Sequence, residues 1–123
     1  MTTTALDFGR DVHQLNAFAP IPSNTKYQAA MTNGVAASIT LPTDAPFYNV
    51  SFRYTPGSEF WIDTTGTTAA IPLSTTPNTT TSEMNPASLK LASGAKISWI
   101  TPNTAANISI VIFQTTGPIG PGY

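Results

Sequence analysis

The carboxylates are the residues of this 123-residue chain that come closest to supplying acid and base chemistry. Hydrolysis of a glycoside requires two carboxyl groups that face each other across a sugar. Glu59 and Asp63 are the only close pair inside a predicted strand, and strand alternation places both on one face with Trp61 between them. A tryptophan ring beside carboxylates can stack on a sugar, but a solvated strand face with a half-buried Trp61 accounts for the same pattern, and we favour that interpretation. The remaining carboxylates are Asp7, Asp11, Asp44 and Glu83.

The other reactive side chains form no catalytic or metal-binding pattern. The single histidine, His13, has no serine in a nucleophile-elbow sequence to activate. Asp44, Asp63 and Glu83 fall in or near predicted loops but lack the spacing of a calcium-binding loop. The chain has no cysteine, and its glycine-rich run at 117–122 carries prolines where phosphate-binding amides would be needed. We therefore predict a protein that is not an enzyme and that uses no cofactor and no metal.

Uncharged polar residues dominate the composition. Only 9% of the residues are charged, the formal net charge is -1 and the isoelectric point is near 5.5. Because the basic residues are few and scattered, no basic stripe is available for a phosphate backbone, and we predict no nucleic-acid partner. The sequence shows neither a basic and apolar leader nor an apolar run of transmembrane length, which predicts synthesis in the cytoplasm and no membrane association. A net charge near zero favours association with other proteins.

Alternation of apolar and polar residues predicts a β-hairpin from Thr25 onward. Tyr27, Ala29 and Met31 alternate with more polar neighbours, and Asn33-Gly34 is the sequence typical of a type I′ turn. The return strand alternates in the same way and ends at Pro42; its apolar residues are Val35, Ala37, Ile39 and Leu41.

Further strands are predicted along the rest of the chain. Residues 64–81 form a Thr-, Pro- and Asn-rich stretch, which we interpret as an exposed loop with an edge strand inside it, because prolines exclude it from a central sheet position. The last strand carries Ile108, Ile110 and Ile112 on one face with Val111 and Phe113 on the other, which indicates a central strand. The predicted strands after the hairpin are 48–54, 59–63, one around 89–91, 96–100 and 108–113.

Short strands with close turn signals and almost no helical pattern predict an all-β fold, an antiparallel β-sandwich of the jelly-roll kind. An eight-stranded barrel is the alternative architecture. We predict an extended N-terminal arm at 1–24, the β-sandwich domain at 25–114 and a flexible Gly/Pro tail at 115–123. For the arm, a first strand or helix of the core is the alternative. The apolar residues of the arm are Leu6, Phe8, Val12, Leu15 and Phe18.

The second half of the chain resembles small proteins encoded near the structural genes of tailed bacteriophages. The resemblance covers about residues 48–114 and lies in short runs, which are Phe60-Trp61-Ile62-Asp63, Thr81-Ser82-Glu83-Met84-Asn85-Pro86, Leu91-Ala92-Ser93-Gly94-Ala95-Lys96-Ile97-Ser98-Trp99-Ile100 and Ala106-Asn107-Ile108-Ser109-Ile110.

This resemblance implies a virion structural protein of the head decoration or cement type, located on the capsid surface. The expected partner is the major capsid protein, and the expected assembly is a homo-oligomer, with a trimer favoured. In this hypothesis the arm lies across a neighbouring capsid subunit, so its apolar residues Leu6, Phe8, Val12, Leu15 and Phe18 form the capsid or subunit interface. No catalytic residue is carried over by the resemblance.

Three other functions fit the sequence in part. A tail, fibre or head-spike component would bind host glycans, and the aromatic residues Trp61, Tyr48 and Tyr54 are then candidates for stacking on sugars. A free carbohydrate-binding module or small hydrolase would be expected to carry a secretion signal or a paired-carboxylate site. An internal scaffold would be expected to be charged and helical, which this chain is not.

Overall fold

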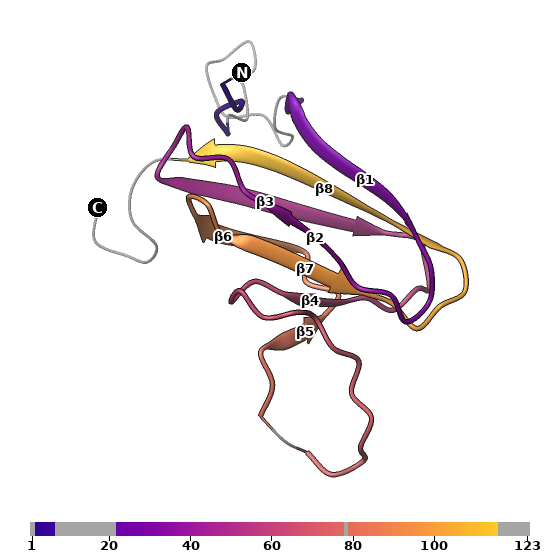
Figure 1. Cartoon of the computed structure of the whole chain (residues 1–123). Coiled ribbons are helices and arrows are strands. Elements are labelled where there is room, and N and C mark those ends of the chain that lie inside the picture. The colour runs from indigo at the N-terminus through magenta and orange to yellow at the C-terminus, as the bar shows by residue number, and fades with distance from the viewer. Residues whose placement is uncertain (1, 7–21, 78, 116–123) are drawn as a thin grey trace, which may run out of the picture.

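The computed structural model describes residues 2–6, 22–77 and 79–115, and all regular structure in this part of the chain is β (Figure 1). Eight strands form two antiparallel sheets of four strands each. The predicted all-β, antiparallel class is therefore confirmed. The strands are β1 (Thr25–Met31), β2 (Ala37–Thr40), β3 (Phe47–Tyr54), β4 (Trp61–Asp63), β5 (Ser82–Met84), β6 (Ser88–Ala92), β7 (Lys96–Ile100) and β8 (Ala106–Thr115).

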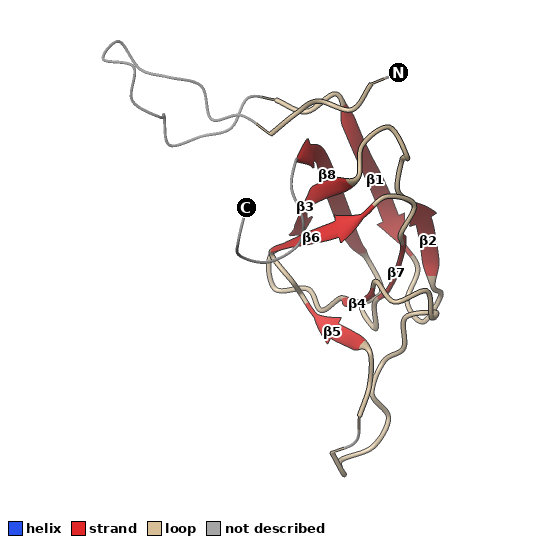
Figure 2. Ribbon diagram, turned by 90° about the vertical axis from the view of Figure 1, so that its left-hand side faces the viewer, coloured by secondary structure: helices blue, strands red, loops and turns tan. Residues whose placement is uncertain are grey.

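Strand pairing joins the beginning of the chain to its end and proceeds inward. β1 pairs with β8, β2 with β7, β3 with β6 and β4 with β5. Two further pairs, β3–β8 and β4–β7, complete sheets with the orders β1-β8-β3-β6 and β2-β7-β4-β5, whose separate layers can be followed in Figure 2. No strand pairing joins the two sheets within the described residues, so the closed eight-stranded barrel is wrong.

The predicted hairpin between β1 and β2 is also wrong, because these strands pair with β8 and β7 in different sheets. The turn itself exists: the Val35 amide donates to the Thr32 carbonyl over 3.3 Å. Gly34 has a φ of 74°, but Asn33 is not at positive φ, so the turn has the dihedral pattern of type II rather than type I′. A type II turn does not have the twist that keeps two strands paired in a hairpin, and this one carries the chain from one sheet to the other.

The core lies between the two sheets and contains the inward-facing side chains of the strands. In β8, Ile108, Ile110 and Ile112 are at most 2% exposed, and the strand is hydrogen-bonded to β1 on one side and β3 on the other. The predicted central position of this strand is therefore confirmed. On the opposite face of β8, Val111 is half-buried and Phe113 is buried. The other fully or nearly buried apolar residues of the core include Tyr48, Val50, Phe52, Phe60, Ile62, Ile97 and Trp99.

The predicted strand at 59–63 is shorter in the structure, and the edge strand predicted within 64–81 is absent from its described residues. β4 begins only at Trp61 because the amides before it bond to side chains: the Glu59 amide donates to Asn103 Oδ1 over 2.7 Å and the Phe60 amide to Asn85 Oδ1 over 2.7 Å. The loop at 64–81 extends away from β4 and β5 in both views (Figures 1 and 2). The predicted Gly/Pro tail lies outside the described residues beyond Thr115.

Candidate interaction sites

Residues 2–6 lie in an extended conformation beside the end of β8. The Leu6 amide donates to the Gln114 carbonyl over 2.9 Å, and the Gln114 amide donates to the Thr4 carbonyl over 2.8 Å. Ala5 is thereby bridged to Gln114 in the parallel sense. Since β1 begins only opposite Ile112 and β3 takes the other side of β8, residues 4–6 occupy the sheet position that β1 leaves open.

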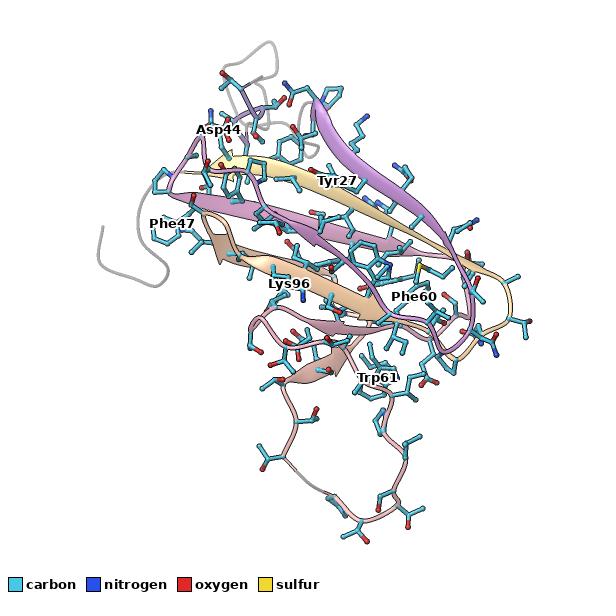
Figure 3. The ribbon with its side chains drawn as sticks, in the orientation of Figure 1. Tyr27, Asp44, Phe47, Phe60, Trp61 and Lys96 are labelled. Carbon is cyan, nitrogen blue, oxygen red and sulfur yellow. The ribbon has the colours of Figure 1, made fainter. Side chains whose placement is uncertain are left out.

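Asp44 fixes this N-terminal strand from the side. Its carboxylate accepts the Thr3 amide at 2.5 Å and the Thr3 hydroxyl at 3.0 Å, and Thr3 is only 3% exposed. The Tyr48 hydroxyl also donates to Asp44 Oδ1, over 2.6 Å. The Tyr48 hydrogen bond, followed by those from Thr3, holds the pKa of Asp44 below its usual value. Figure 3 shows Asp44 at the end of the sheets beside the described N-terminal residues.

Asn24 completes the attachment through a reciprocal pair of hydrogen bonds with Thr4. The Thr4 amide donates to Asn24 Oδ1 and the Asn24 amide donates to Thr4 Oγ1, each over 2.9 Å. The Asn24 side-chain amide also donates to the Thr2 carbonyl over 2.8 Å. We call the residues that hold the N-terminal strand, Asn24, Asp44 and Gln114, the clasp. The two ends of the segment 7–21 therefore leave the described structure close together.

Of the predicted arm residues, only Leu6 belongs to the described part, and it is half-buried beside Gln114. The other arm residues, Phe8, Val12, Leu15 and Phe18, lie outside the described residues, as does His13. Their predicted role at a capsid or subunit interface stays a prediction. Sequence reasoning missed the clasp entirely, because nothing in the spacing of Thr3, Asn24 and Asp44 indicates that they meet.

A second polar cluster lies on the outer face of the β2-β7-β4-β5 sheet. The cross-strand register aligns Ser98, Asp63 and Ser82 in one row. Loop 64–81 bonds to this row: the Ala69 amide donates to Ser98 Oγ over 2.9 Å, and the Ala70 amide donates to Ser82 Oγ over 3.2 Å. The row therefore holds the loop against the sheet.

Asp63, at the centre of that row, is only 1% exposed, so the prediction of a solvated face is wrong at this residue. Burial raises the pKa of its carboxyl, but hydrogen bonds from Thr81, Thr65 and Ser82 outweigh burial and lower the pKa below its usual value. The shortest of these bonds is 2.6 Å, from Thr81 Oγ1 to Asp63 Oδ2. A carboxylate with this many donors is a structural acceptor, and its oxygens are already engaged by the loop.

Trp61 is the candidate ligand-stacking residue whose position suits that role best. Its indole Nε1 donates to Glu59 Oε2 over 2.6 Å, which fixes the ring, and the ring is half-buried. The register aligns Trp61 with Ile100 and Met84 on the outer face of the sheet, and Met84 is 57% exposed. Figure 3 places Trp61 where the 64–81 loop leaves the sheets. Glu59 is thus occupied by Trp61, while Asp63 is occupied by the loop.

The two tyrosines proposed for the same role are positioned differently. Tyr48 has no exposed surface, so it offers no ring face to a sugar, and burial together with the Asp44 carboxylate raises the pKa of its hydroxyl. Tyr54 is half-buried, packs against Phe60 with ring centroids 5.3 Å apart, and donates from its hydroxyl to the Pro86 carbonyl over 2.6 Å. Burial raises the pKa of Tyr54 well above its usual value. The structure therefore does not bring Trp61, Tyr48 and Tyr54 together as one exposed platform.

Within the described ranges, no three His, Cys, Asp or Glu residues lie close enough to hold a metal ion. No helix in the described part is long and apolar enough to cross a membrane. In comparisons with known proteins, no family model, no curated protein and no solved structure matches this chain.

Proposed function

We propose that this chain is a non-enzymatic structural protein of a bacteriophage virion, which binds the outside of the capsid and bridges major capsid subunits as a decoration or cement protein. The observation that carries the proposal is the strand order, β1-β8-β3-β6 against β2-β7-β4-β5. This nested order is the one we assign to a jelly roll, a fold that recurs in viral capsid proteins and lectins. The resemblance of residues 48–114 to phage virion proteins points in the same direction.

The position of the chain ends supports a role in bridging. Residues 6 and 22, which flank the segment 7–21, and Thr115, which precedes 116–123, all lie at the end of the sheets that carries the clasp. A module whose additional segments leave from one end can place that end on a particle and keep the opposite end free. The 64–81 loop lies away from the clasp end (Figure 1).

The apolar residues between 7 and 21 supply the binding energy in this proposal. Fully burying Phe8, Val12, Leu15 and Phe18 against a capsid subunit would contribute about 1.5–3 kcal/mol each. Their sum, on the order of 10 kcal/mol, is comparable with the 4–15 kcal/mol that association costs. One arm alone would therefore bind weakly, and several arms in a homo-oligomer, for which we favour a trimer, would bind tightly through their high effective concentration.

The first test is binding to capsids that lack the protein. We expect the intact chain to sediment with the particles, to saturate at a copy number that matches a class of symmetry-related sites, and to raise the resistance of the particles to heat. The informative variant replaces residues 7–21 by a Gly/Ser linker of about six residues, which spans roughly 20 Å. Such a linker suffices because Thr4 and Asn24 are already in contact. We expect this variant to fold and to lose capsid binding.

A matched control separates the length of the arm from its apolar side chains. It keeps residues 7–21 but changes Phe8, Val12, Leu15 and Phe18 to serine, and we expect the same loss of binding. If the intact chain does not bind at all, the capsid proposal is wrong. If both variants still saturate the particles, capsid binding stands and the arm is not its cause.

A glycan-binding component of a tail, fibre or head spike is the second candidate function. It is favoured by the half-buried Trp61, whose ring is held by Glu59 on an outer sheet face. In that case the intact chain should be retained by immobilised host-surface polysaccharide, and Trp61→Ala should abolish retention, because loss of the ring removes the stacking surface. Tyr54→Phe is the control and should leave retention unchanged, since Tyr54 is turned toward Phe60 and Pro86. Retention of the Trp61→Ala variant at full strength would exclude this role for Trp61.

A further inference from the structure

The N-terminal strand is attached by directional polar contacts and buries little apolar surface. Thr2 and Ala5 are exposed and Leu6 is half-buried, while Thr3 and Thr4 are bound through both backbone and hydroxyl groups. A hydrogen bond of this kind contributes about 1 kcal/mol net. Residues 2–6 can therefore detach from the clasp without disturbing the core between the two sheets.

The clasp is also selective for the sequence that it holds. Asp44 accepts both the amide and the hydroxyl of Thr3, and Asn24 exchanges two hydrogen bonds with Thr4. An occupant must therefore present two consecutive hydroxyl residues in an extended strand with free backbone groups for Gln114. Every other copy of this chain carries that sequence by identity.

The connection between the N-terminal strand and β1 is long enough to reach a neighbour. Residues 7–21 separate Leu6 from the segment that leads into β1, and a chain of that length spans up to about 50 Å when extended. Both ends of this connection lie beside the clasp, because Thr4 contacts Asn24. The same strand can therefore fill either its own clasp or that of an adjacent copy.

We propose that residues 2–6 are exchanged between copies of this chain, so that the N-terminal strand of one copy occupies the clasp of the next. The contacts are the same within and between copies, as in domain swapping, so their energies cancel. The balance then depends on the protein concentration relative to the effective concentration of the chain's own strand, which is on the order of mM for a linker of this size. Exchange is thus expected to increase when copies are concentrated or held side by side.

The test uses disulfide formation, because the chain has no cysteine of its own. Ala5 and Gln114 are bridge partners in neighbouring strands, which are about 4.8 Å apart and within the range that a disulfide spans. Ala5→Cys and Gln114→Cys are made in separate full-length chains, mixed in equal amounts, equilibrated and then oxidised. A disulfide between the two variants forms efficiently only if the N-terminal strand of one copy lies in the clasp of the other. We expect the yield of this heterodimer to rise steeply, up to about 100-fold, between roughly 10 µM and 1 mM protein.

The control mixes Ala5→Cys with Ser38→Cys, an exposed position on β2, to measure disulfides formed by random collision. A second control adds Asn24→Ala to the Gln114→Cys chain, which weakens the clasp and should reduce the heterodimer. A yield at 1 mM no higher than in the Ser38 mixture overturns the proposal. The experiment contains no capsid, so its outcome is independent of whether the chain decorates a virion.

Discussion

At the residue scale, the structure assigns new roles to side chains that first suggested chemistry. Glu59 and Asp63 resemble a catalytic pair in sequence, yet Glu59 accepts the Trp61 indole and Asp63 accepts hydroxyls and an amide from loop 64–81 and its neighbours. Asp63 therefore resembles a structural anchor: a buried carboxylate whose desolvation is offset by hydrogen bonds. Its value to the fold can be measured because asparagine has nearly the same shape.

We predict that Asp63→Asn lowers the free energy of unfolding by about 1–3 kcal/mol at pH 7, because the new amide group faces donors such as the Thr65 and Thr81 hydroxyls and leaves them unsatisfied. Urea denaturation measures the difference. Glu83→Gln is the control, since Glu83 is exposed on the adjacent strand β5, and it should change stability by less than about 0.5 kcal/mol. Equal effects of the two substitutions would contradict the role of Asp63.

The same pair of proteins makes a pH prediction. The pKa of Asp63 is lower in the folded protein than the value of about 3.9 for an unfolded chain. The ionised carboxylate therefore contributes stability above about pH 4, and this contribution is lost as the pH falls through the folded pKa. We expect the stability difference between the natural chain and Asp63→Asn to be constant from pH 5 to 7 and to shrink below pH 4. A difference that grows on acidification would mean that the sign of the pKa shift is wrong.

At the scale of the elements, β8 organises its sheet because it is the longest strand and pairs with both β1 and β3. Its alternation divides the strand into a core face, with Ile108, Ile110 and Ile112, and an outer face that includes Val111. Ile112 has no exposed surface and lies between Thr25 of β1 and Val50 of β3. Truncating it should open a cavity that the neighbouring strands cannot close.

We predict that Ile112→Ala lowers the free energy of unfolding by about 2–5 kcal/mol, the range for removing a buried isoleucine side chain. Val111→Ala is the matched control on the other face of the same strand. Because Val111 is only half-buried, its truncation should cost clearly less. Urea midpoints with unchanged m values report both differences. A larger loss for Val111→Ala than for Ile112→Ala would reverse the assignment of the two faces.

At the scale of the whole molecule, the nested pairing brings the start and end of the chain together. Residues 25–31 pair with 106–112, so the strand nearest the N-terminus is completed only when the last strand is present. The clasp extends this arrangement, since residues 2–6 bond to Gln114 and to Asp44 from the loop before β3. The capsid-binding and strand-exchange experiments both address this end of the molecule. Capsid binding without exchange, exchange without capsid binding, and both together are separate results.

The sequence by itself determined where most strands lie and which of their side chains are buried. Side chains alternate between the two faces of a strand, so a period of two in residues 48–54 and 108–113 is visible without knowledge of any neighbour. β3 and β8 follow these predictions, and the central position of β8 followed from apolar residues on both faces. The composition also indicated a β-rich chain that is nearly free of charge.

Only the tertiary structure decided which strands are neighbours and where the polar clusters lie. Asn33-Gly34 predicted a hairpin from local signals, but the two flanking strands pair with β8 and β7 in different sheets. Asp63 looked solvated until loop 64–81 was seen to bond across its sheet face. The clasp joins Thr3, Asn24, Asp44 and Gln114, which are far apart in sequence. Alternation specifies a face but not a partner, because pairing depends on how the whole chain folds back on itself.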